Sequence, residues 1–255
     1  MQLTGLAGKA AFVTGAAGGI GRAVVDGLLA SGVRVFATDR QVEPAWSAAE
    51  GPVWGTALDI SDEVAVQRVI SEADTDMGGF DFGVNVAGIL DTTPVAELSG
   101  DVWRRVFDVN CHGTFFVCRA LAARMAERRQ GAIVVVGSNA AGIPRKNMAA
   151  YAASKAAATM FLRCLGLEVA GHGVRCNIVA PGSTLTPMQT GMWRTEAAEA
   201  QIIEGDLASY RTGIPLKKFA MPEDIANAAI FLLSEQAGHI TMADIYVDGG
   251  ATLRG

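Results

Sequence analysis

The chain has 255 residues, half of them hydrophobic, which is enough for one sizeable core and one large α/β domain over residues 1–255. Its net charge is −5 and its pI about 5.3, with no run of Lys or Arg, so we expect no nucleic-acid partner. The chain opens without a basic-then-apolar leader, and no apolar run is long enough to span a bilayer. We therefore expect no membrane partner and a cytoplasmic location.

Short apolar runs alternate with helical patterns along most of the chain. Several runs are nearly continuous in Val, Ile, Phe and Ala, which is typical of strands buried on both faces. The predicted strands are Ala10–Thr14, Val33–Thr38, Val53–Leu58, Phe80–Asn85, Ala132–Val136, Val174–Ala180 and Ile245–Val247. The predicted helices are Ile20–Ala30, Glu63–Thr75, Asp101–Arg128, Met148–Val169 and Glu223–Leu233. This alternation predicts an α/β fold, a doubly wound parallel sheet with helices on both faces.

Residues 184–213 break this rhythm. A long insertion of this kind after a late strand predicts a lid over a site, and an ordinary helical excursion that packs on the core is the alternative. The apolar side chains of the segment show no strand pattern and are Met188, Met192, Trp193, Ile202, Ile203 and Leu207.

The four cysteines form no CxxC pair and lie in apolar stretches, so we expect reduced core residues. They are Cys111, Cys118, Cys164 and Cys176. The three histidines are scattered and cluster with neither Cys nor carboxylates, so no metal site is expected.

A glycine-rich loop follows the first predicted strand and opens the first helix. The segment Thr14–Gly21 reads TGAAGGIG. Its residues Gly15, Gly19 and Gly21 let the backbone turn tightly and approach a pyrophosphate, and the helix N-terminus supplies free N–H groups. Because the loop stands between a strand and a helix, it predicts a dinucleotide site.

Carboxylates follow the next two strands. Asp39 ends the second strand, where a carboxylate would bind the ribose hydroxyls of NAD and repel the 2′-phosphate of NADP. The neighbouring Arg40 would suit that phosphate, so NADP is the alternative to NAD. Asp59 and Ile60 follow the third strand and are candidates to contact the adenine, although Asp59 would equally suit a turn.

Tyr151 and Lys155 stand in YAASK, inside a stretch without Pro or Gly over Met148–Leu165. Such a stretch predicts a helix, and a spacing of four puts both side chains on one face. A free tyrosine has a pKa of about 10, but a cation beside it favours the phenolate. The pair is a candidate general base for an alcohol proton, and a shared surface face is the alternative.

Six motifs together resemble the short-chain dehydrogenases/reductases over essentially the whole chain. The resemblance implies a Rossmann fold with a seven-stranded parallel sheet, a nicotinamide cofactor and a homotetramer in which the last strand packs at a subunit interface. The motifs are Thr14–Gly21, Asn85-Val86-Ala87-Gly88, Asn110, Ser138, Tyr151-xxx-Lys155 and Pro181-Gly182.

The resemblance also implies residue roles. Tyr151 would be the catalytic acid/base, and Lys155 would lower its pKa and hold the nicotinamide ribose. Ser138 would orient the substrate oxygen, and Asn110 would hold a water that links Lys155 to solvent. The further cofactor contacts implied are Ile20, Asn85, Ala87, Gly88, Pro181, Gly182, Thr184 and Thr186.

Longer stretches in the second half resemble the 2,3-dihydro-2,3-dihydroxybenzoate dehydrogenases of catechol siderophore pathways. They cover residues 137–145, 173–184 with 188–189, 213–216, 239–242 and 247–253. The implied reaction is NAD-dependent oxidation of a ring hydroxyl on a cyclohexadiene carboxylate to give an aromatic product. Arg145 would bind the substrate carboxylate, or else be a surface residue, and Met188 and Gln189 would touch the ring.

Two departures from that group open alternatives. Asp91 stands where those enzymes carry an Arg, and Thr186 is followed by Pro187 rather than by an acidic residue. Asp91 would pair with an amino group, which favours trans-2,3-dihydro-3-hydroxyanthranilate as an alternative substrate. A dehydrogenase of another alcohol and a non-catalytic NAD sensor are the further alternatives.

Overall fold

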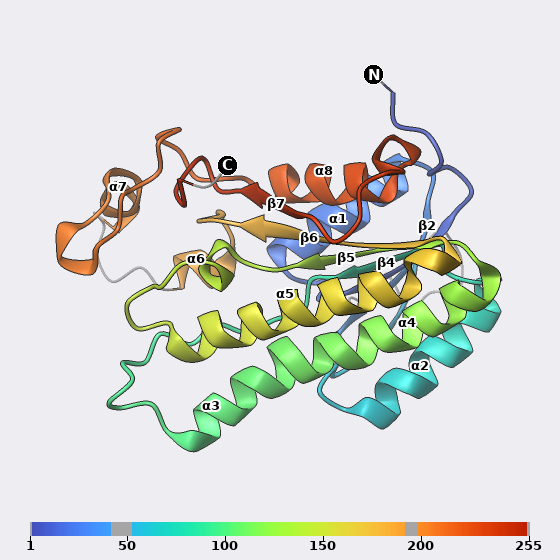
Figure 1. The fold of residues 1–255 in the computed structure, drawn as a ribbon, viewed down its shortest axis with the longest axis horizontal. Helices are drawn as coiled ribbons and strands as arrows, with labels where there is room; N and C mark the ends of the chain where they lie inside the picture. Colours follow the sequence, from blue (N-terminus) through green and yellow to red (C-terminus); the bar gives the residue numbers. More distant parts are fainter. Residues whose placement is uncertain (1, 42–52, 192–197, 254–255) are drawn as a thin grey trace.

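The computed structural model describes residues 2–41, 53–191 and 198–253 and contains a seven-stranded sheet (Figure 1). All strands are parallel, in the order β3-β2-β1-β4-β5-β6-β7. The strands are β1 (Ala10–Thr14), β2 (Arg34–Asp39), β3 (Val53–Ala57), β4 (Phe82–Asn85), β5 (Gly131–Val136), β6 (Val174–Pro181) and β7 (Asp244–Val247). The predicted doubly wound sheet is therefore confirmed.

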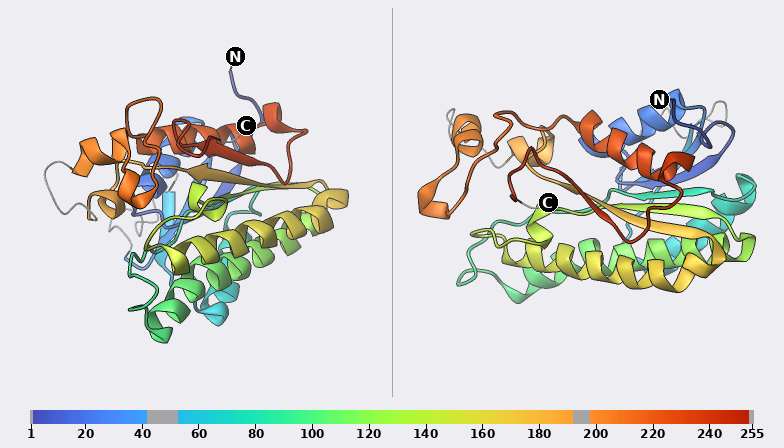
Figure 2. Two further views of the ribbon diagram at one scale, coloured as in Figure 1. Left: turned by 60° about the vertical axis from the view of Figure 1, so that its left-hand side comes forward. Right: turned by 45° about the horizontal axis from the view of Figure 1, so that its top comes forward.

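Helices cover both faces of the sheet (Figures 1 and 2). On one face, α1 (Gly19–Ala30) packs against α8 (Pro222–Leu233), because each turns a stripe of Val, Leu, Ile and Ala toward the same core. On the other face lie α2 (Glu63–Asp76), α4 (Thr114–Arg128) and α5 (Ala149–Val169). Strands between two such layers are buried on both sides, and every residue of β1 is buried.

The strand order reverses beside β1, which lies between β2 and β4. In open α/β sheets, ligands bind outside the carboxyl ends of the strands at this reversal. The loop after β1 carries the glycines, and the loop after β4 carries Ala87 and Gly88. The topology alone therefore places the predicted cofactor residues at one edge.

The predicted helix Asp101–Arg128 is wrong in one respect, because it is not continuous. It consists of α3 (Gly100–Phe107), a π-helical segment (Asp108–Gly113) and α4. The Thr114 hydroxyl donates to the Asn110 carbonyl oxygen at 2.8 Å, so this carbonyl is satisfied inside the widened turn. Such π-helical turns are frequent at functional sites, and this one contains Asn110.

The segment 184–213 forms an arm at the carboxyl end of the sheet (Figures 1 and 2). It contains α6 (Pro187–Thr190), α7 (Ala198–Glu204) and a 3-10 turn (Leu207–Ser209). Met192 and Trp193 lie outside the described residues. Leu207 is almost fully exposed, so it does not contribute to a packed interior.

The cysteine prediction is only partly confirmed. Cys118 and Cys176 are buried and Cys111 is half-buried, but Cys164 is exposed on α5, because it lies on the side of that helix turned away from the sheet. Among the described residues, no three His, Cys, Asp or Glu side chains gather in a way that could hold a metal ion. No described helix is long and apolar enough to cross a membrane.

Candidate active site

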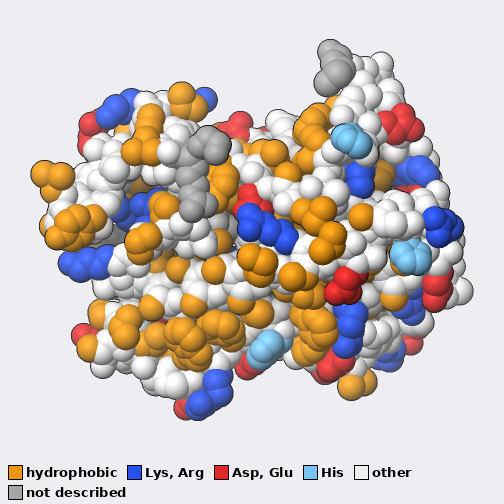
Figure 3. Space-filling model, viewed as in Figure 1, with side chains coloured by type: hydrophobic (Ala, Val, Ile, Leu, Met, Phe, Trp, Pro, Cys, Tyr) orange, Lys and Arg blue, Asp and Glu red, His pale blue; other side chains and the backbone are white. Residues whose placement is uncertain are grey.

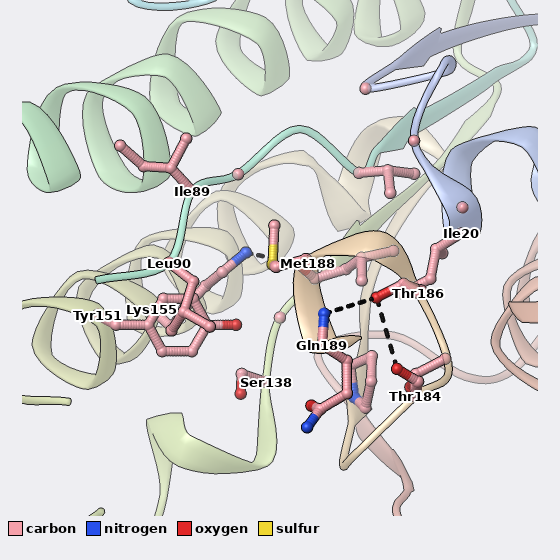
Figure 4. A pocket seen from close by; sticks show the side chains of 18 of the residues that line it. Ile20, Ile89, Leu90, Ser138, Tyr151, Lys155, Thr184, Thr186, Met188 and Gln189 are labelled. Atoms are coloured by element: carbon pink, nitrogen blue, oxygen red, sulfur yellow. Dashed lines mark hydrogen bonds between the residues drawn. The ribbon is translucent and has the colours of Figure 1, made fainter. Parts of the chain in front are cut away.

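A cavity runs along the carboxyl ends of the strands, between the glycine loop, α5 and the arm (Figure 4). Most predicted site residues line it. These are Gly15, Gly19, Ile20, Gly21, Asp39, Asp59, Ile60, Ala87, Gly88, Ser138, Arg145, Tyr151, Lys155, Pro181, Gly182, Thr184, Thr186, Met188 and Gln189. Asn85, Asn110 and Asp91 do not line it.

Glycine is required at two positions of the loop after β1. Gly15 has a φ of +65°, and a Cβ there would lie 2.6 Å from the Ala87 nitrogen. A Cβ on Gly21 would collide with the Gly15 carbonyl oxygen. The loop therefore turns tightly against the β4 end, and α1 begins at Gly19 with its first N–H groups free for an anion. This open backbone cradle suits a dinucleotide pyrophosphate.

Asp39 lines the cavity at the end of β2, as predicted. Its two carboxylate oxygens accept hydrogen bonds from the Ala17 amide at 3.1 Å and the Arg40 amide at 2.7 Å. The carboxylate is thereby held beside the glycine loop, where a ribose would lie. Asp59 also lines the cavity, and it accepts from the Ser61 hydroxyl and amide, which lower the pKa of its carboxyl. Asp59 therefore serves a turn as well as the cavity wall.

Asn85 lies beneath the site rather than in its wall. It accepts a hydrogen bond from the Thr14 hydroxyl at 2.6 Å and donates one to the Thr114 hydroxyl at 3.0 Å. The Thr14 hydroxyl in turn accepts from the Ala87 amide at 3.3 Å. The structure thus supports a positioning role for Asn85 in place of the predicted direct cofactor contact. It fixes the ends of β1 and β4 to each other.

Tyr151 and Lys155 lie one turn apart on α5, and both face the cavity beside Ser138 (Figure 4). The Lys155 ammonium donates to the Val136 carbonyl oxygen at 2.9 Å and lies 6.0 Å from the centre of the Tyr151 ring. Because the lysine is buried, its pKa falls to about 8. It still carries its charge for the most part at neutral pH.

The pKa of Tyr151 differs from the sequence prediction. Burial raises the pKa of the phenol, and a hydrogen bond with the Ser138 hydroxyl opposes that rise. Burial is the largest effect on this pKa, so the predicted lowering by the Lys155 charge does not control it in this structure. The Lys155 ammonium itself donates to the Val136 carbonyl oxygen. Ser138 therefore supports the phenolate form and also lies where a substrate oxygen would bind.

Asn110 is fully buried behind this pair. Its side-chain oxygen accepts from the Ile89 amide at 2.8 Å, and its side-chain nitrogen donates to the Ile89 carbonyl oxygen at 2.9 Å. The same nitrogen donates to the Ser154 hydroxyl at 3.1 Å, and that hydroxyl donates to the Tyr151 carbonyl oxygen at 2.8 Å. A Cβ on Gly88 would lie 3.2 Å from both the Asn110 oxygen and the Lys155 nitrogen.

Sequence reasoning missed several residues of the site. Ser154 stands between Tyr151 and Lys155, and its position on the helix could have suggested it. Ile89 and Leu90 directly follow a recognised motif and line the cavity. Arg211 also lines it, and no local sequence pattern points to it.

The arm contributes the wall opposite Tyr151 (Figure 4). The Thr186 hydroxyl accepts from the Gln189 amide at 3.3 Å and starts the short helix that presents Met188 and Gln189. A Cβ on Gly19 would lie 3.1 Å from the Thr186 methyl carbon, so the arm rests on the glycine loop. The described part of the segment therefore lies against the glycine loop and lines the cavity, and its action as a lid stays a prediction.

Two predicted substrate residues have different surroundings. Arg145 lines the cavity and is half-buried. The Asp91 carboxylate accepts a hydrogen bond from the Thr93 amide at 2.9 Å and thus serves its own turn. Nothing in this arrangement turns Asp91 toward a ligand in the cavity.

Known proteins resemble this chain in sequence and in fold. A family model described as "Enoyl-(Acyl carrier protein) reductase" matches residues 15–252. The 2,3-dihydro-2,3-dihydroxybenzoate dehydrogenase of Bacillus subtilis (strain 168) is 49% identical, with 99% of each chain covered. This chain belongs to the short-chain dehydrogenase/reductase family. The vibriobactin-specific 2,3-dihydro-2,3-dihydroxybenzoate dehydrogenase of Vibrio cholerae serotype O1 (strain ATCC 39315 / El Tor Inaba N16961) is 42% identical, with 99% of each chain covered.

The fold is also similar to those of solved structures. A short-chain dehydrogenase/reductase family oxidoreductase from Burkholderia thailandensis matches with a TM-score of 0.82 and 32% identity, covering 97% of this chain and 94% of that chain. Short-chain dehydrogenases are oxidoreductases that use a nicotinamide cofactor. The glycine cradle, the open start of α1 and the Asp39 carboxylate fit such a cofactor.

Proposed function

We propose that this protein oxidises 2,3-dihydro-2,3-dihydroxybenzoate to 2,3-dihydroxybenzoate with NAD, as a step of catechol siderophore biosynthesis. The observation that carries the proposal is that Ser138, Tyr151 and Lys155 share one cavity with Arg145, a cation suited to a ring carboxylate. The names of the two similar dehydrogenases support the same substrate.

In this proposal the chain performs the proton chemistry. Tyr151 accepts the proton of one ring hydroxyl while Ser138 holds the oxygen that becomes a carbonyl. A nicotinamide cofactor held by the glycine loop and Asp39 would supply the acceptor for the carbinol hydrogen, which leaves as a hydride. The ketone then loses the proton on the adjacent ring carbon and regains one on its oxygen, which gives the aromatic catechol. Lys155 and Asn110, through a water as the family resemblance implies, return the Tyr151 proton to solvent.

The choice of NAD rests on Asp39. Its carboxylate is held beside the glycine loop, where it would accept hydrogen bonds from ribose hydroxyls and repel a 2′-phosphate. The Arg40 amide donates to that carboxylate, so the backbone of this arginine also supports Asp39.

We further propose that the protein acts in the cytoplasm as a homotetramer. Two features support self-association. The strand β7 has only β6 as a neighbour in the described sheet, and hydrophobic side chains gather over α3 and α5 (Figure 3), where Trp103, Met160 and Leu167 are exposed. Light scattering on the purified protein tests the number of subunits, and a monomer at micromolar concentration would contradict the proposal.

The substrate is tested by mixing the protein with NAD and either 2,3-dihydro-2,3-dihydroxybenzoate or trans-2,3-dihydro-3-hydroxyanthranilate and following NADH absorbance. We expect faster turnover of the dihydroxy acid. The amino substrate was favoured only by the expected pairing of its amino group with Asp91. Asp91 does not line the cavity, and its carboxylate accepts a hydrogen bond from the Thr93 amide. Faster turnover of trans-2,3-dihydro-3-hydroxyanthranilate would overturn this choice, provided that Asp91→Arg abolishes that turnover. Turnover of neither would remove the substrate and leave the family assignment intact.

A further inference from the structure

Two arginines from distant parts of the chain face the same cavity. Arg145 lies in the connection between β5 and α5, and Arg211 lies in the arm. Both side chains are half-buried. Within the described part of the chain, neither guanidinium donates a hydrogen bond or forms an ion pair, although nine other arginines between residues 34 and 175 do so. Their positive charges are therefore available to a ligand.

The two charges act on each other. Both guanidiniums line the same cavity. The pKa of Arg145 is lowered first by burial and then by the charge of Arg211. The charge of Asp248 opposes this effect. Its carboxylate is already occupied, because it accepts from the Asn139 side chain at 3.3 Å and the amides of Gly250 and Thr252 at 2.9 and 3.0 Å. An anion bound between two like charges would relieve their repulsion.

The backbone holds Arg211 in place. Arg211 and Asp206 exchange two backbone hydrogen bonds of 2.9 and 3.0 Å, and the Asp206 carboxylate also caps the turn that follows it by accepting from the Ala208 amide. The pKa of Asp206 is lowered mainly by Ser209 and Ala208, with a smaller effect of the Lys146 charge. The paired backbone of Asp206 and Arg211 therefore fixes the place of Arg211 within the arm.

The anion that would bind between these arginines is not the pyrophosphate of the cofactor. The adenosine end of the site lies at Asp39 on β2, and the pyrophosphate cradle follows β1. Arg145 follows β5, which is three strand spacings, about 14 Å, from β2. Arg145 also precedes Tyr151 by only six residues. The arginine pair thus lies at the end of the cavity where the hydroxyl proton is removed.

We propose that Arg211 is a specificity-determining residue that binds the carboxylate of the ring substrate together with Arg145. This inference rests on the proposed function for the identity of the ring. Two guanidiniums from different segments donate hydrogen bonds to the same carboxylate. The ring is thereby oriented with its hydroxyl toward Ser138 and Tyr151. A dihydrodiol without a carboxylate would lack this anchor.

The test compares Arg211→Met with the wild type on two diols, 2,3-dihydro-2,3-dihydroxybenzoate and the uncharged trans-5,6-dihydroxycyclohexa-1,3-diene. We expect the KM for the acid to rise roughly 10- to 100-fold, as for loss of a charge-assisted hydrogen bond. The kcat/KM for the uncharged diol and the KM for NAD should stay within about twofold of wild type. Arg211→Lys should restore part of the loss. The matched control Arg68→Met removes an exposed arginine on α2, outside the cavity, and should change neither diol.

Two results would overturn the inference. Equal loss on both diols would mean that Arg211 only supports the arm, and no loss on the acid would mean that it does not touch the carboxylate. Calorimetry of 2,3-dihydroxybenzoate binding in the presence of NADH tests carboxylate binding by the arginine pair even if the wild type oxidises neither diol. Weaker binding to Arg211→Met than to Arg68→Met would then support the arginine pair while the proposed function fails. Equal binding, or none to the wild type, would overturn the pair.

Discussion

The side-chain amide of Asn110 donates a hydrogen bond to the Ser154 hydroxyl, 3.1 Å away, and so ties the π-helical segment to the helix that carries Tyr151 and Lys155. This contact belongs to a buried chain of hydrogen bonds that runs from β1 through β4 and α4 to α5. Its members, in order, are Thr14, Asn85, Thr114, Asn110, Ser154 and the Tyr151 carbonyl oxygen. The strand β1 before the glycine loop and the helix α5 are thereby held in one polar framework.

Asn110→Ala should reduce both stability and activity. The substitution leaves the amide and the carbonyl oxygen of Ile89 without their partner and breaks the link to Ser154. We expect the free energy of unfolding to fall by about 2–4 kcal/mol, since each unpaired group costs about 1–3 kcal/mol. Urea unfolding measures this loss. Ser154→Ala is the control, because it breaks the link but spares Ile89, and it should lose less than about 1.5 kcal/mol. Equal losses of unfolding free energy in the two variants would mean that the contacts of Asn110 with Ile89 do not contribute to stability.

Tyr151→Phe should lower kcat by about 100- to 10,000-fold, because it removes the acceptor of the substrate proton. Binding of NADH, followed by its fluorescence, should stay close to wild type, which separates an enzyme from a nucleotide sensor. A phenylalanine variant that keeps its turnover would exclude Tyr151 as the base.

Ser138→Ala offers a finer test of the same pair. The Ser138 hydrogen bond lowers the pKa of Tyr151, so its loss should raise that pKa further. For alcohol oxidation the base must be deprotonated, so the acid limb of the kcat/KM profile should move to higher pH. A variant with lower activity but an unmoved limb would show that Ser138 acts only on the substrate.

Much of this fold follows from local patterns in the sequence. Strands buried on both faces are apolar throughout, and their predicted bounds agree with the structure to within about two residues. Asp62 caps α2 by accepting from the Ala65 amide at 3.0 Å, as its residue type predicts. The glycine loop could be recognised because its constraints are local, between Gly15, Gly21 and the turn after β4.

Other features depend on contacts that no local pattern contains. A helical repeat of 3.6 residues cannot reveal one widened turn, so the π-helical segment around Asn110 was predicted as a regular helix. A spacing of four places Tyr151 and Lys155 on one face but gives no information on burial, which controls both pKa values. Arg211 reaches the cavity only because the arm folds back over the sheet edge.

Asp39→Ala should shift the cofactor preference toward NADP. Removing the carboxylate removes the repulsion of a 2′-phosphate and leaves the Arg40 cation next to its site. We expect the KM for NAD to rise about tenfold or more and the ratio of kcat/KM for NADP over NAD to rise by a larger factor. Initial rates with each cofactor at saturating substrate measure both. Asp59→Ala, at the end of the next strand, should change the ratio far less, because Ser61 already engages its carboxylate. Unchanged preference in Asp39→Ala would refute the assignment of NAD to this residue.

Lys155 should give the protein a distinctive dependence of stability on pH. Its pKa falls from 10.5 to about 8 on folding because the ammonium is buried, so the unfolded chain binds more protons between those values. Stability then rises with pH across that window, and this contribution is lost as the pH falls through about 8. The cysteines oppose it, since burial raises the pKa of Cys111, Cys118 and Cys176 and favours unfolding above about pH 9. The difference between the wild type and Lys155→Met isolates the lysine.

We expect the wild type to gain about 2 kcal/mol relative to Lys155→Met between about pH 7 and pH 9.5, at about 1.4 kcal/mol per pKa unit. Urea unfolding at the two pH values measures the gain. Lys218→Met, which removes an exposed lysine, should follow the wild-type profile. At about pH 7, Lys155→Met should also be more stable than the wild type while lacking activity, because the buried charge is kept for catalysis at a cost in stability. A stability difference between the wild type and Lys155→Met that does not change with pH would mean that the Lys155 ammonium keeps its hydration in the folded protein.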